Sequence, residues 1–355
     1  MSAGGESPRP VGKKNRFLRC AWRQAHRRSQ HALEGRTRKE RRMGQLNLAF
    51  DIPALPAKHH RPDTTITNKI VVSVSGGRSS MFMARMSQLH WADEYEIVFI
   101  FCNTGWEHPR TLEFVKECAE HWGMNIVWLE AEINPKRGKG VLYRVVNFQT
   151  ASRCGRPFRE MIQKLGLPNK AFPFCTRDLK TRPSFAYIRD ALGWGGEGKL
   201  GTNYYLALGI RADEPKRLRA TPGRIYPLAG AWESDKQDVL DWWEEQPFDL
   251  NRPLLTGETI PFPERYGNCV WCWKKSLRKH LLNLHEHPEW YEFPAEMEQQ
   301  YGHHGAGFTG EPRVFFREGR STQDLIKLAE VATPDERMGS RFGEDDGCSE
   351  SCEAF

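Results

Sequence analysis

The stretch VVSVSGGRSSMFMARM, residues 71–86, joins a strand-like run to a helix-like run. The apolar residues before Ser75 predict a buried strand, and the apolar spacing after Ser80 predicts a helix. A turn between a parallel strand and a helix lies at the carboxyl edge of the sheet, where α/β folds bind ligands. The helix side chains expected to face inward are Met81, Ala84, Met86 and Leu89.

The turn itself has the composition of a phosphate cradle. Gly76 and Gly77 permit positive φ angles and a close approach of the backbone. Successive N–H groups and the positive end of the following helix then favour an anion. The spacing is neither that of a Walker A loop nor G-x-G-x-x-G, and a plain connection of small residues is the alternative. The residues expected to hold phosphate are Ser75, Gly76, Gly77, Arg78, Ser79 and Ser80.

Strand-like and helix-like segments alternate beyond this turn. Residues 95–105 and 125–133 are apolar runs typical of buried parallel strands. Residues 108–123 predict a helix, with Pro109 in its first turn and Gly123 at its end. This alternation predicts an α/β fold with a doubly wound, Rossmann-like parallel sheet. After about residue 230 the pattern becomes mainly helical and contains a pair of cysteines.

Composition restricts the class of protein. The 355 residues are 39% hydrophobic and 27% charged, which is typical of a globular chain. No apolar run reaches about 18 residues, so we expect no membrane span. The first twenty residues lack the apolar core of a signal peptide, so we expect a cytoplasmic protein with reduced thiols.

The positive net charge of +7 comes from one terminal segment. Residues 1–43 contain 13 Lys or Arg and 3 acidic residues, a net charge of +10, so the remainder is 7 − 10 = −3. This basic arm is either an electrostatic contact for nucleic acid or a solvated tail. A third interpretation is that translation naturally starts at Met43.

Four of the nine cysteines are candidates for one metal centre. Cys269 and Cys272 have the C-x-x-C spacing of a chelate or a redox pair. Cys175 is a third candidate, and its neighbours Arg177, Lys180 and Arg182 would suit a negatively charged group. The tail offers a fourth thiol, with Cys352 favoured and Cys348 or Cys154 as alternatives. Four thiolates fit an iron–sulfur cluster or zinc, and free thiols are the remaining interpretation.

Four ordered segments resemble one family. SGGRSS, residues 75–80, resembles the S-G-G-x-x-S loop of the PP-loop ATP pyrophosphatases, the adenine nucleotide alpha hydrolase-like superfamily. The other three resemble its phosphoadenosine phosphosulfate (PAPS) reductase branch. They are FCNTGWEHPRTLEFV (101–115), LGIRADEPKR (208–217) and YPLAGAWESDKQDVLDWW (226–243). The Cys- and Trp-rich insert and the basic arm resemble members found in phage and mobile-element genomes.

The resemblance implies a role for several residues. Beyond the loop, Asn103, Thr104 and Glu107 would line the adenosine side of an adenine nucleotide, ATP or PAPS. Arg211 and Arg217 would contact phosphate or sulfate, because guanidinium groups match such oxyanions. Glu214, with Asp213, would orient these arginines or bind Mg²⁺. The resemblance also favours a [4Fe-4S] cluster over zinc. The predicted catalytic residues are Arg211, Glu214 and Lys180, and Gly209 joins the predicted nucleotide contacts.

The resemblance implies sulfur chemistry, but with one departure. The E-C-G-x-H motif that carries the nucleophilic cysteine of assimilatory PAPS reductases is absent from this sequence. We therefore expect a PAPS-reductase-like enzyme of sulfur transfer or reduction, with a sulfur donor or reductant protein as a partner. The alternatives are an ATP pyrophosphatase in nucleic-acid modification, such as DNA phosphorothioation or RNA thiolation, and a non-catalytic nucleotide-binding module.

The expected organisation has four parts. They are a basic arm (1–65), a PP-loop α/β domain (66–250), a Cys-x-x-Cys helical region (251–335) and a flexible Cys-containing tail (336–355).

Overall fold

The computed structural model describes residues 62–332, except for residues 137, 254–257 and 306–309. The predicted tail and nearly all of the predicted basic arm therefore lie outside the described residues, and so does Cys352. The helices and strands used below are β1 (Lys69–Val74), α2 (Arg78–His90), β2 (Glu96–Cys102), α3 (Pro109–Trp122), β3 (Ile126–Ile133), β4 (Val141–Val146), α4 (Arg156–Leu165), α5 (Phe174–Thr176), α6 (Arg182–Asp190), β5 (Tyr205–Ala207), β6 (Arg224–Ile225), α7 (Lys236–Glu244), β7 (Asn251–Pro253), β8 (Thr259–Pro261), α8 (Leu277–Glu286), α9 (Glu292–Tyr301) and α10 (Thr322–Val331).

The main sheet has six strands in the order β4-β3-β2-β1-β5-β6. All neighbouring pairs are parallel except β3 and β4, which are antiparallel. The α/β class and the largely parallel sheet are thus confirmed, whereas the edge strand β4 was not expected from the sequence. The chain builds outward from β1 to β3 and then places β5 on the other side of β1. The strand order therefore reverses between β1 and β5, the position where such sheets bind ligands.

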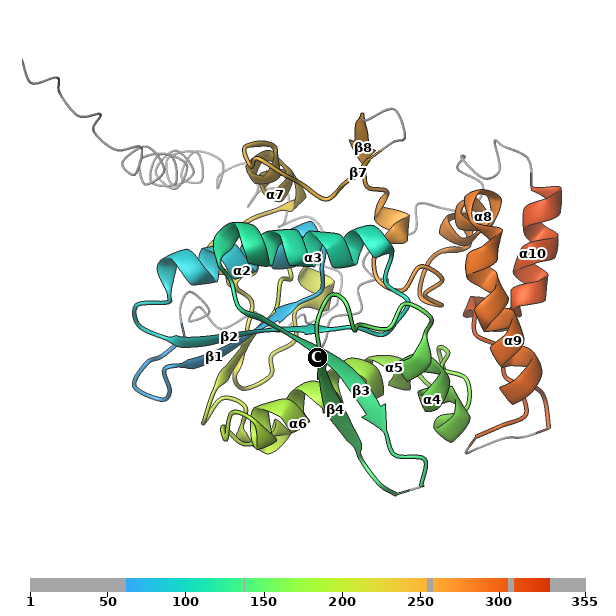
Figure 1. Ribbon diagram of the computed structural model, residues 1–355, viewed down its shortest axis with the longest axis horizontal. Coiled ribbons are helices and arrows are strands. Elements are labelled where there is room, and N and C mark those ends of the chain that lie inside the picture. Colours follow the sequence, from blue (N-terminus) through green and yellow to red (C-terminus); the bar gives the residue numbers. More distant parts are fainter. Residues whose placement is uncertain (1–61, 137, 254–257, 306–309, 333–355) are drawn as a thin grey trace, which may run out of the picture. The chain divides into compact units, whose positions relative to one another are not determined.

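Helices cover both faces of this sheet (Figure 1). Val72 and Val74 of β1 belong to a hydrophobic cluster with residues of α2, α3 and α7. Val71 belongs to another cluster, on the side of α6. Neighbouring strand residues point to opposite faces, so a strand apolar on both faces, as β1 is, must be buried on both.

Helix α2 follows the predicted inward pattern except at its end. Met81 and Ala84 are buried, and Met86 is partly buried against the same cluster. The prediction for Leu89 was wrong, because its side chain is 53% exposed. The neighbouring Trp91, which ends the helix, is buried instead.

Helix α3 begins and ends as its sequence indicates. Pro109 is its first residue, and the side chain of His108 accepts a hydrogen bond from the backbone N–H of Arg110. Gly123 ends the helix in the left-handed conformation, with φ of 59°, which glycine adopts without steric cost.

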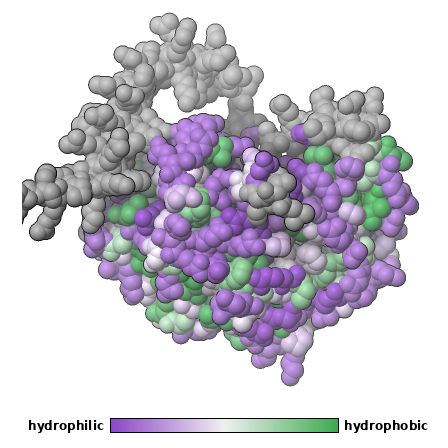
Figure 2. Space-filling model, turned by 45° about the horizontal axis from the view of Figure 1, so that its top comes forward, coloured by the Kyte–Doolittle hydropathy of each residue, from purple (hydrophilic) through white to green (hydrophobic). Residues whose placement is uncertain are grey.

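The C-terminal region shares hydrophobic clusters with the α/β part of the chain. Phe158 and Met161 of α4 cluster with Trp271, Phe293 and Phe315. None of the helices in the described ranges has the length and apolar character needed to cross a bilayer. The face shown in Figure 2 is largely hydrophilic, with scattered smaller hydrophobic areas.

Candidate functional site: a loop pocket beside a cysteine cavity

The Ser-Gly-Gly turn leaves β1 at the point where the strand order reverses. Gly76 has φ of 78°, and a Cβ placed on it would lie 2.5 Å from Cγ2 of Thr111. Glycine is therefore required here by both conformation and space. A Cβ on Gly77 would meet only the Ser75 hydroxyl, at 3.8 Å. Gly77 therefore leaves open space where a ligand can approach the backbone.

Ser80 fixes the shape of the turn. Its Oγ accepts hydrogen bonds from the backbone N–H (3.1 Å) and hydroxyl (3.0 Å) of Ser75, and donates one to the carbonyl oxygen of Gly77 (3.0 Å). Gly77 is the N-cap of helix α2, which has no side-chain cap and no acidic residue in its first turn. Its first N–H groups and positive helix end are thus left for an anion.

Arg78 follows the two glycines, and its guanidinium is already paired with a carboxylate. Its guanidinium donates to both carboxylate oxygens of Asp249, at 2.7 and 2.8 Å, and to the carbonyl oxygen of Leu250 at 2.8 Å. This predicted nucleotide-binding residue therefore ties the start of α2 to the segment that follows α7.

The segment after β5 lies against this turn. A Cβ on Gly209 would be 3.0 Å from the Cα of Ser80, so glycine permits the close approach of the two segments. Arg211 donates from Nη1 to the hydroxyl of Ser79 (3.2 Å) and from Nε to Asp213 (2.8 Å).

The carboxylate of Glu214 organises the same segment. It accepts the backbone N–H of Arg211 at 3.1 Å and pairs with the guanidinium of Arg217. Three of the predicted site residues, Arg211, Glu214 and Arg217, are thus brought together beside the turn.

These segments enclose the loop pocket, an open pocket of about 280 Å³. Among the lining residues, Thr111 is buried and packs its Cγ2 against Gly76. The predicted residues that line the pocket are Ser75, Gly76, Gly77, Arg78, Ser79, Ser80, Gly209, Arg211, Glu214 and Arg217. Its other lining residues include Thr111, Lys236, Glu264, Gly267, Asn268 and Lys279.

Asn103, Thr104 and Glu107 do not line the loop pocket. The carboxylate of the buried Glu107 accepts the backbone N–H (2.9 Å) and hydroxyl (2.8 Å) of Thr104, and it shapes the turn after β2. The amide of Asn103 donates to Glu130 at 2.6 Å and to the carbonyl oxygen of Ser152 at 2.9 Å.

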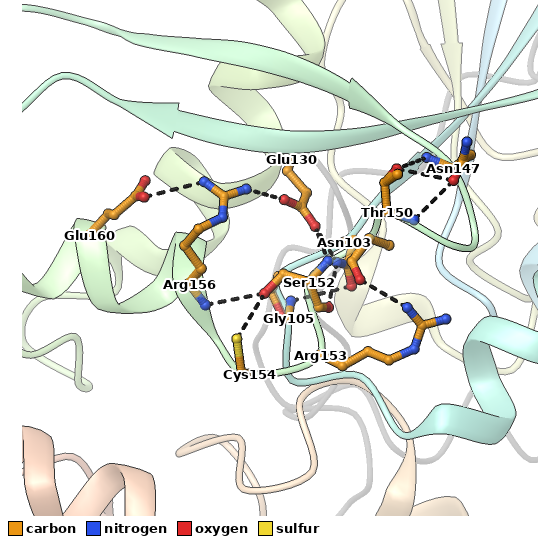
Figure 3. Close-up of polar contacts among 12 residues, drawn as sticks. Asn103, Gly105, Glu130, Asn147, Thr150, Ser152, Arg153, Cys154, Arg156 and Glu160 are labelled. Atoms are coloured by element: carbon orange, nitrogen blue, oxygen red, sulfur yellow. Dashed lines mark hydrogen bonds and ion pairs between the residues drawn. The ribbon is translucent and has the colours of Figure 1, made fainter.

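Glu130, on β3, is the centre of a buried polar network (Figure 3). Its fully buried carboxylate also accepts the backbone N–H of Ser152 at 2.6 Å and pairs with Arg156. Cys154 lies beside this network with its side chain exposed, 3.8 Å from the Ser152 hydroxyl. The network satisfies a buried charge and anchors the segment before α4.

The second feature is the cysteine cavity, a small space of about 10 Å³. Cys175, Cys269 and Cys272 all line it and are all buried. Cys175 lies on the short helix α5, whereas a turn closed by the Cys272 N–H to the Cys269 carbonyl (2.9 Å) holds the other two. Sγ of Cys269 is 3.3 Å from the hydroxyl of Thr104. The cavity thus brings Cys175 to the Cys269–Cys272 pair, from which it is distant in sequence.

Two buried cations accompany these thiols. Lys180 lines the cavity and is 6% exposed. Lys275 is 1% exposed and donates from Nζ to the carbonyl oxygen of Gly267 at 2.6 Å. Trp271 and Trp273 also line the cavity, and the indole N–H of each is buried without an acceptor. Lys180 is thus a buried cation among the residues that line the cavity.

This donor set is incomplete for a single metal ion within the described residues. No group of three or more His, Cys, Asp or Glu side chains is arranged there to hold one. Cys154 does not line the cavity, and the predicted fourth ligand, Cys352, lies outside the described residues.

Comparison with known proteins identifies the family. Residues 69–222 match the family model described as the phosphoadenosine phosphosulfate reductase domain. The chain is 34% identical, over 294 residues, to the nin region protein ORF290 of Escherichia phage lambda. That alignment covers 80% of this chain and 94% of the phage protein. The chain belongs to the PAPS reductase family. The lambda relative is consistent with the phage-type branch of this PP-loop family.

One solved structure is similar at low identity. The U34-tRNA thiolase NcsA from Methanococcus maripaludis, solved with its [4Fe-4S] cluster, matches 84% of each chain at 14% identity. Its TM-score to this PAPS reductase family member is 0.28.

Sequence reasoning missed several residues of the site. Thr111 was detectable, since it lies within the family-like segment 101–115. Lys236 was detectable in the same way, since it lies within the family-like segment 226–243. Lys279 had no local signal, because only the tertiary fold brings α8 to the loop pocket.

Proposed function

We propose that this protein binds an adenine nucleotide in the loop pocket and performs sulfur transfer or reduction at the cysteine cavity. The observation that carries the proposal is the adjacency of the two sites. Gly267 and Asn268 line the loop pocket, and the next residue, Cys269, lines the cysteine cavity. One short segment therefore joins a phosphate-binding turn to a group of thiols.

The loop pocket supports the nucleotide part of the proposal. An uncapped helix start and two glycines favour a phosphate group, and Arg211 and Arg217 add guanidinium groups that match phosphate and sulfate. Glu214 holds both arginines in place, and with Asp213 it is the proposed contact for Mg²⁺.

The cysteine cavity supports the sulfur part. We infer that Cys175, Cys269 and Cys272 hold a sulfur-bearing cofactor, a [4Fe-4S] cluster in preference to zinc. The buried ammonium group of Lys180, a lining residue, offsets part of the negative charge that several thiolates bring. When bound, such a cluster supplies electrons or an open iron site for sulfur.

Other cysteines are poor candidates for this chemistry. Burial raises the pKa of Cys102 to about 11, against the weaker opposing effects of the Ser184 hydrogen bond and the charge of Lys180. Burial likewise raises the pKa of Cys118. Both remain thiols at neutral pH, and a thiol is a weaker nucleophile and ligand than a thiolate.

Anaerobic purification with iron, sulfide and zinc analysis tests the cofactor. We expect a brown protein with broad absorbance near about 400 nm, as thiolate-bound clusters show, and loss of that colour in Cys272→Ser. Cys118→Ser is the matched control, because Cys118 is buried but does not line the cavity. A colourless protein that contains one zinc would show that the cavity holds zinc and not a cluster. A metal-free protein would overturn the proposed metal centre.

Titration calorimetry with ATP and PAPS, followed by turnover assays, tests the nucleotide part. We expect binding of at least one of them, and sulfite release from PAPS would establish reduction. ATP cleavage that requires added nucleic acid would instead favour the nucleic-acid modification alternative, with the basic arm as the contact. Absence of binding to both nucleotides by a folded protein would overturn the proposal.

A further inference from the structure

We propose that Lys236 and Lys279 form a second phosphate subsite in the loop pocket, and that the carboxylate of Glu264 occupies it until a nucleotide binds. This inference rests on the proposed nucleotide binding and defines its substrate class. The ligand is an adenine nucleotide with a phosphate beyond the one held by the Ser-Gly-Gly turn.

The two lysines reach the loop pocket from outside the matched family domain. Lys236 is the first residue of α7 and Lys279 lies in the first turn of α8, both after residue 222. Asp235 and Asp238 form a capping box at the start of α7. The backbone N–H groups of Asp235 and Asp238 are therefore engaged, and the positive charge that this end of α7 adds to the pocket is the side chain of Lys236.

The carboxylate of Glu264 lies beside Lys236 in the pocket, where the proposed phosphate would bind. Glu264 lines the same pocket, and its carboxylate lies 2.5 Å from Nζ of Lys236. Partial desolvation in the pocket opposes its ionisation, but the hydrogen bond and charge of Lys236 outweigh it. With the charges of Lys279 and Arg211, they lower the pKa of Glu264. One carboxylate is thus attracted by cations from three segments of the chain.

The contact between Lys236 and Glu264 is suited to exchange. Their side chains are 54% and 67% exposed, and exposed ion pairs contribute little to stability. A phosphate carries more negative charge than a carboxylate and offers more acceptor oxygens. A nucleotide phosphate can therefore displace Glu264 without disturbing the fold.

The turn at the start of α2 and the lysines of α7 and α8 line the same pocket. In the proposed arrangement the turn accepts one phosphate and the lysines accept another. AMP lacks the two terminal phosphates of ATP, and adenosine 5′-phosphosulfate lacks the 3′-phosphate of PAPS. The subsite should consequently discriminate ATP from AMP, or PAPS from adenosine 5′-phosphosulfate.

Calorimetry on the full chain tests this inference with all four nucleotides. Lys236→Ala and Lys279→Ala should each weaken binding of ATP or PAPS about tenfold, the effect of one lost charge-assisted contact. Binding of AMP should change less than about twofold. Glu264→Gln should tighten ATP or PAPS binding several-fold, because the competing charge is removed. Lys327→Ala on α10, which loses an exposed charge that lines neither site, is the control.

The four ligands also identify the source of the phosphate. If the lysine variants lose affinity for ATP but not for AMP, and PAPS binding is unchanged, the subsite holds the polyphosphate. If they lose affinity only for PAPS and not for adenosine 5′-phosphosulfate, the subsite holds the 3′-phosphate. Equal losses for AMP and ATP would overturn the subsite, as would a Glu264→Gln variant with unchanged affinities. If the wild-type chain binds none of the four, the proposed nucleotide function fails and this inference fails with it. Thermal unfolding of each variant confirms that the fold is intact.

Discussion

At the scale of single residues, the two neighbouring glycines of the turn have different tasks. Gly76 is fixed by its positive φ and by Thr111, whereas Gly77 borders open space. The sequence alone does not distinguish the two glycines, and only the fold shows that their roles differ.

Replacing Gly77 should affect the ligand more than the fold. Gly77→Val places two methyl groups where a phosphate must approach, so we expect nucleotide affinity to fall more than tenfold. The free energy of unfolding should fall by only about 1 kcal/mol, because valine is a poor N-cap. Calorimetry and urea unfolding measure the two effects. Unchanged affinity in the folded variant would remove the turn from the binding site.

Gly76→Ala, unlike Gly77→Val, should affect the stability of the fold. A non-glycine residue at φ of 78°, with its Cβ 2.5 Å from Thr111, is strained. We expect a loss of about 1 to 3 kcal/mol in unfolding free energy. A stability equal to that of the wild type would show that the turn is not held in this conformation.

His108 makes the free energy of unfolding depend on pH in a defined direction. Burial, together with the positive charges of His287, Arg252 and Arg110, lowers its pKa to about 4. The unfolded state, with a pKa near 6.5, then binds the proton more readily than the folded state. The stabilisation is therefore complete above about pH 6.5 and is lost as the pH falls toward 4, by up to about 3 kcal/mol.

The variant His108→Asn separates this effect from other titrations. Asparagine can still cap α3 but does not titrate. We expect the variant to be less stable at pH 7.5, because the ring of His108 stacks on Tyr266 at 5.3 Å. The stability difference from wild type should narrow between pH 6.5 and 4. The buried His280 titrates in both proteins and cancels, so a constant difference would contradict the assignment to His108.

At the scale of elements, the sequence predicted the strands and helices that have one clear period. β1, β2 and β3 are apolar runs, and α2 and α3 have regular inward positions, so their type was evident. β4 was missed because its exposed Leu142 and Val145 break the alternation of apolar and polar residues that indicates a strand. Its antiparallel pairing with β3 follows a simple reversal of the chain, so no intervening helix marked it.

The segment before α4 depends on the buried charge of Glu130. Glu130→Ala removes the acceptor of Asn103, Ser152 and Arg156, and leaves two buried donors unpaired. We expect a loss of about 3 kcal/mol in unfolding free energy. Hydrogen exchange should also increase over residues 147–156.

Glu160→Ala is the matched control for this experiment. Glu160 pairs with the same Arg156 at 3.2 Å, but both side chains are about one-third exposed. Its loss should cost less than about 1 kcal/mol. Equal effects of the two substitutions would show that the burial of Glu130 is energetically unimportant.

At the scale of the whole molecule, the candidate site is assembled by tertiary packing. Sequence patterns located the Ser-Gly-Gly turn, the arginines after β5 and the cysteine pair, because each is a local motif. Lys236 was not singled out, although it lies in the family-like segment 226–243. Glu264 and Lys279 were not located, since an isolated charge on a helix or loop has no periodic signal. The meeting of Cys175 with Cys269 and Cys272 was predicted, but the clusters that join α4 to α9 and position these thiols could not be.

The basic arm can be tested by truncation at this scale. Residues 1–43 are rich in Arg and Lys and have no periodic apolar face, whereas the α/β pattern of the sequence starts near residue 70. A chain that begins at Met43 should therefore keep its melting temperature within about 1 °C and bind nucleotides unchanged. Removal of a net charge of +10 should in turn weaken any nucleic-acid binding and flatten its dependence on salt, because fewer counterions are released. Calorimetry and fluorescence titration from 50 to 200 mM salt measure both effects. A fall of several degrees in melting temperature would show that the arm packs on the fold, and an unchanged salt slope would exclude the arm as the nucleic-acid contact.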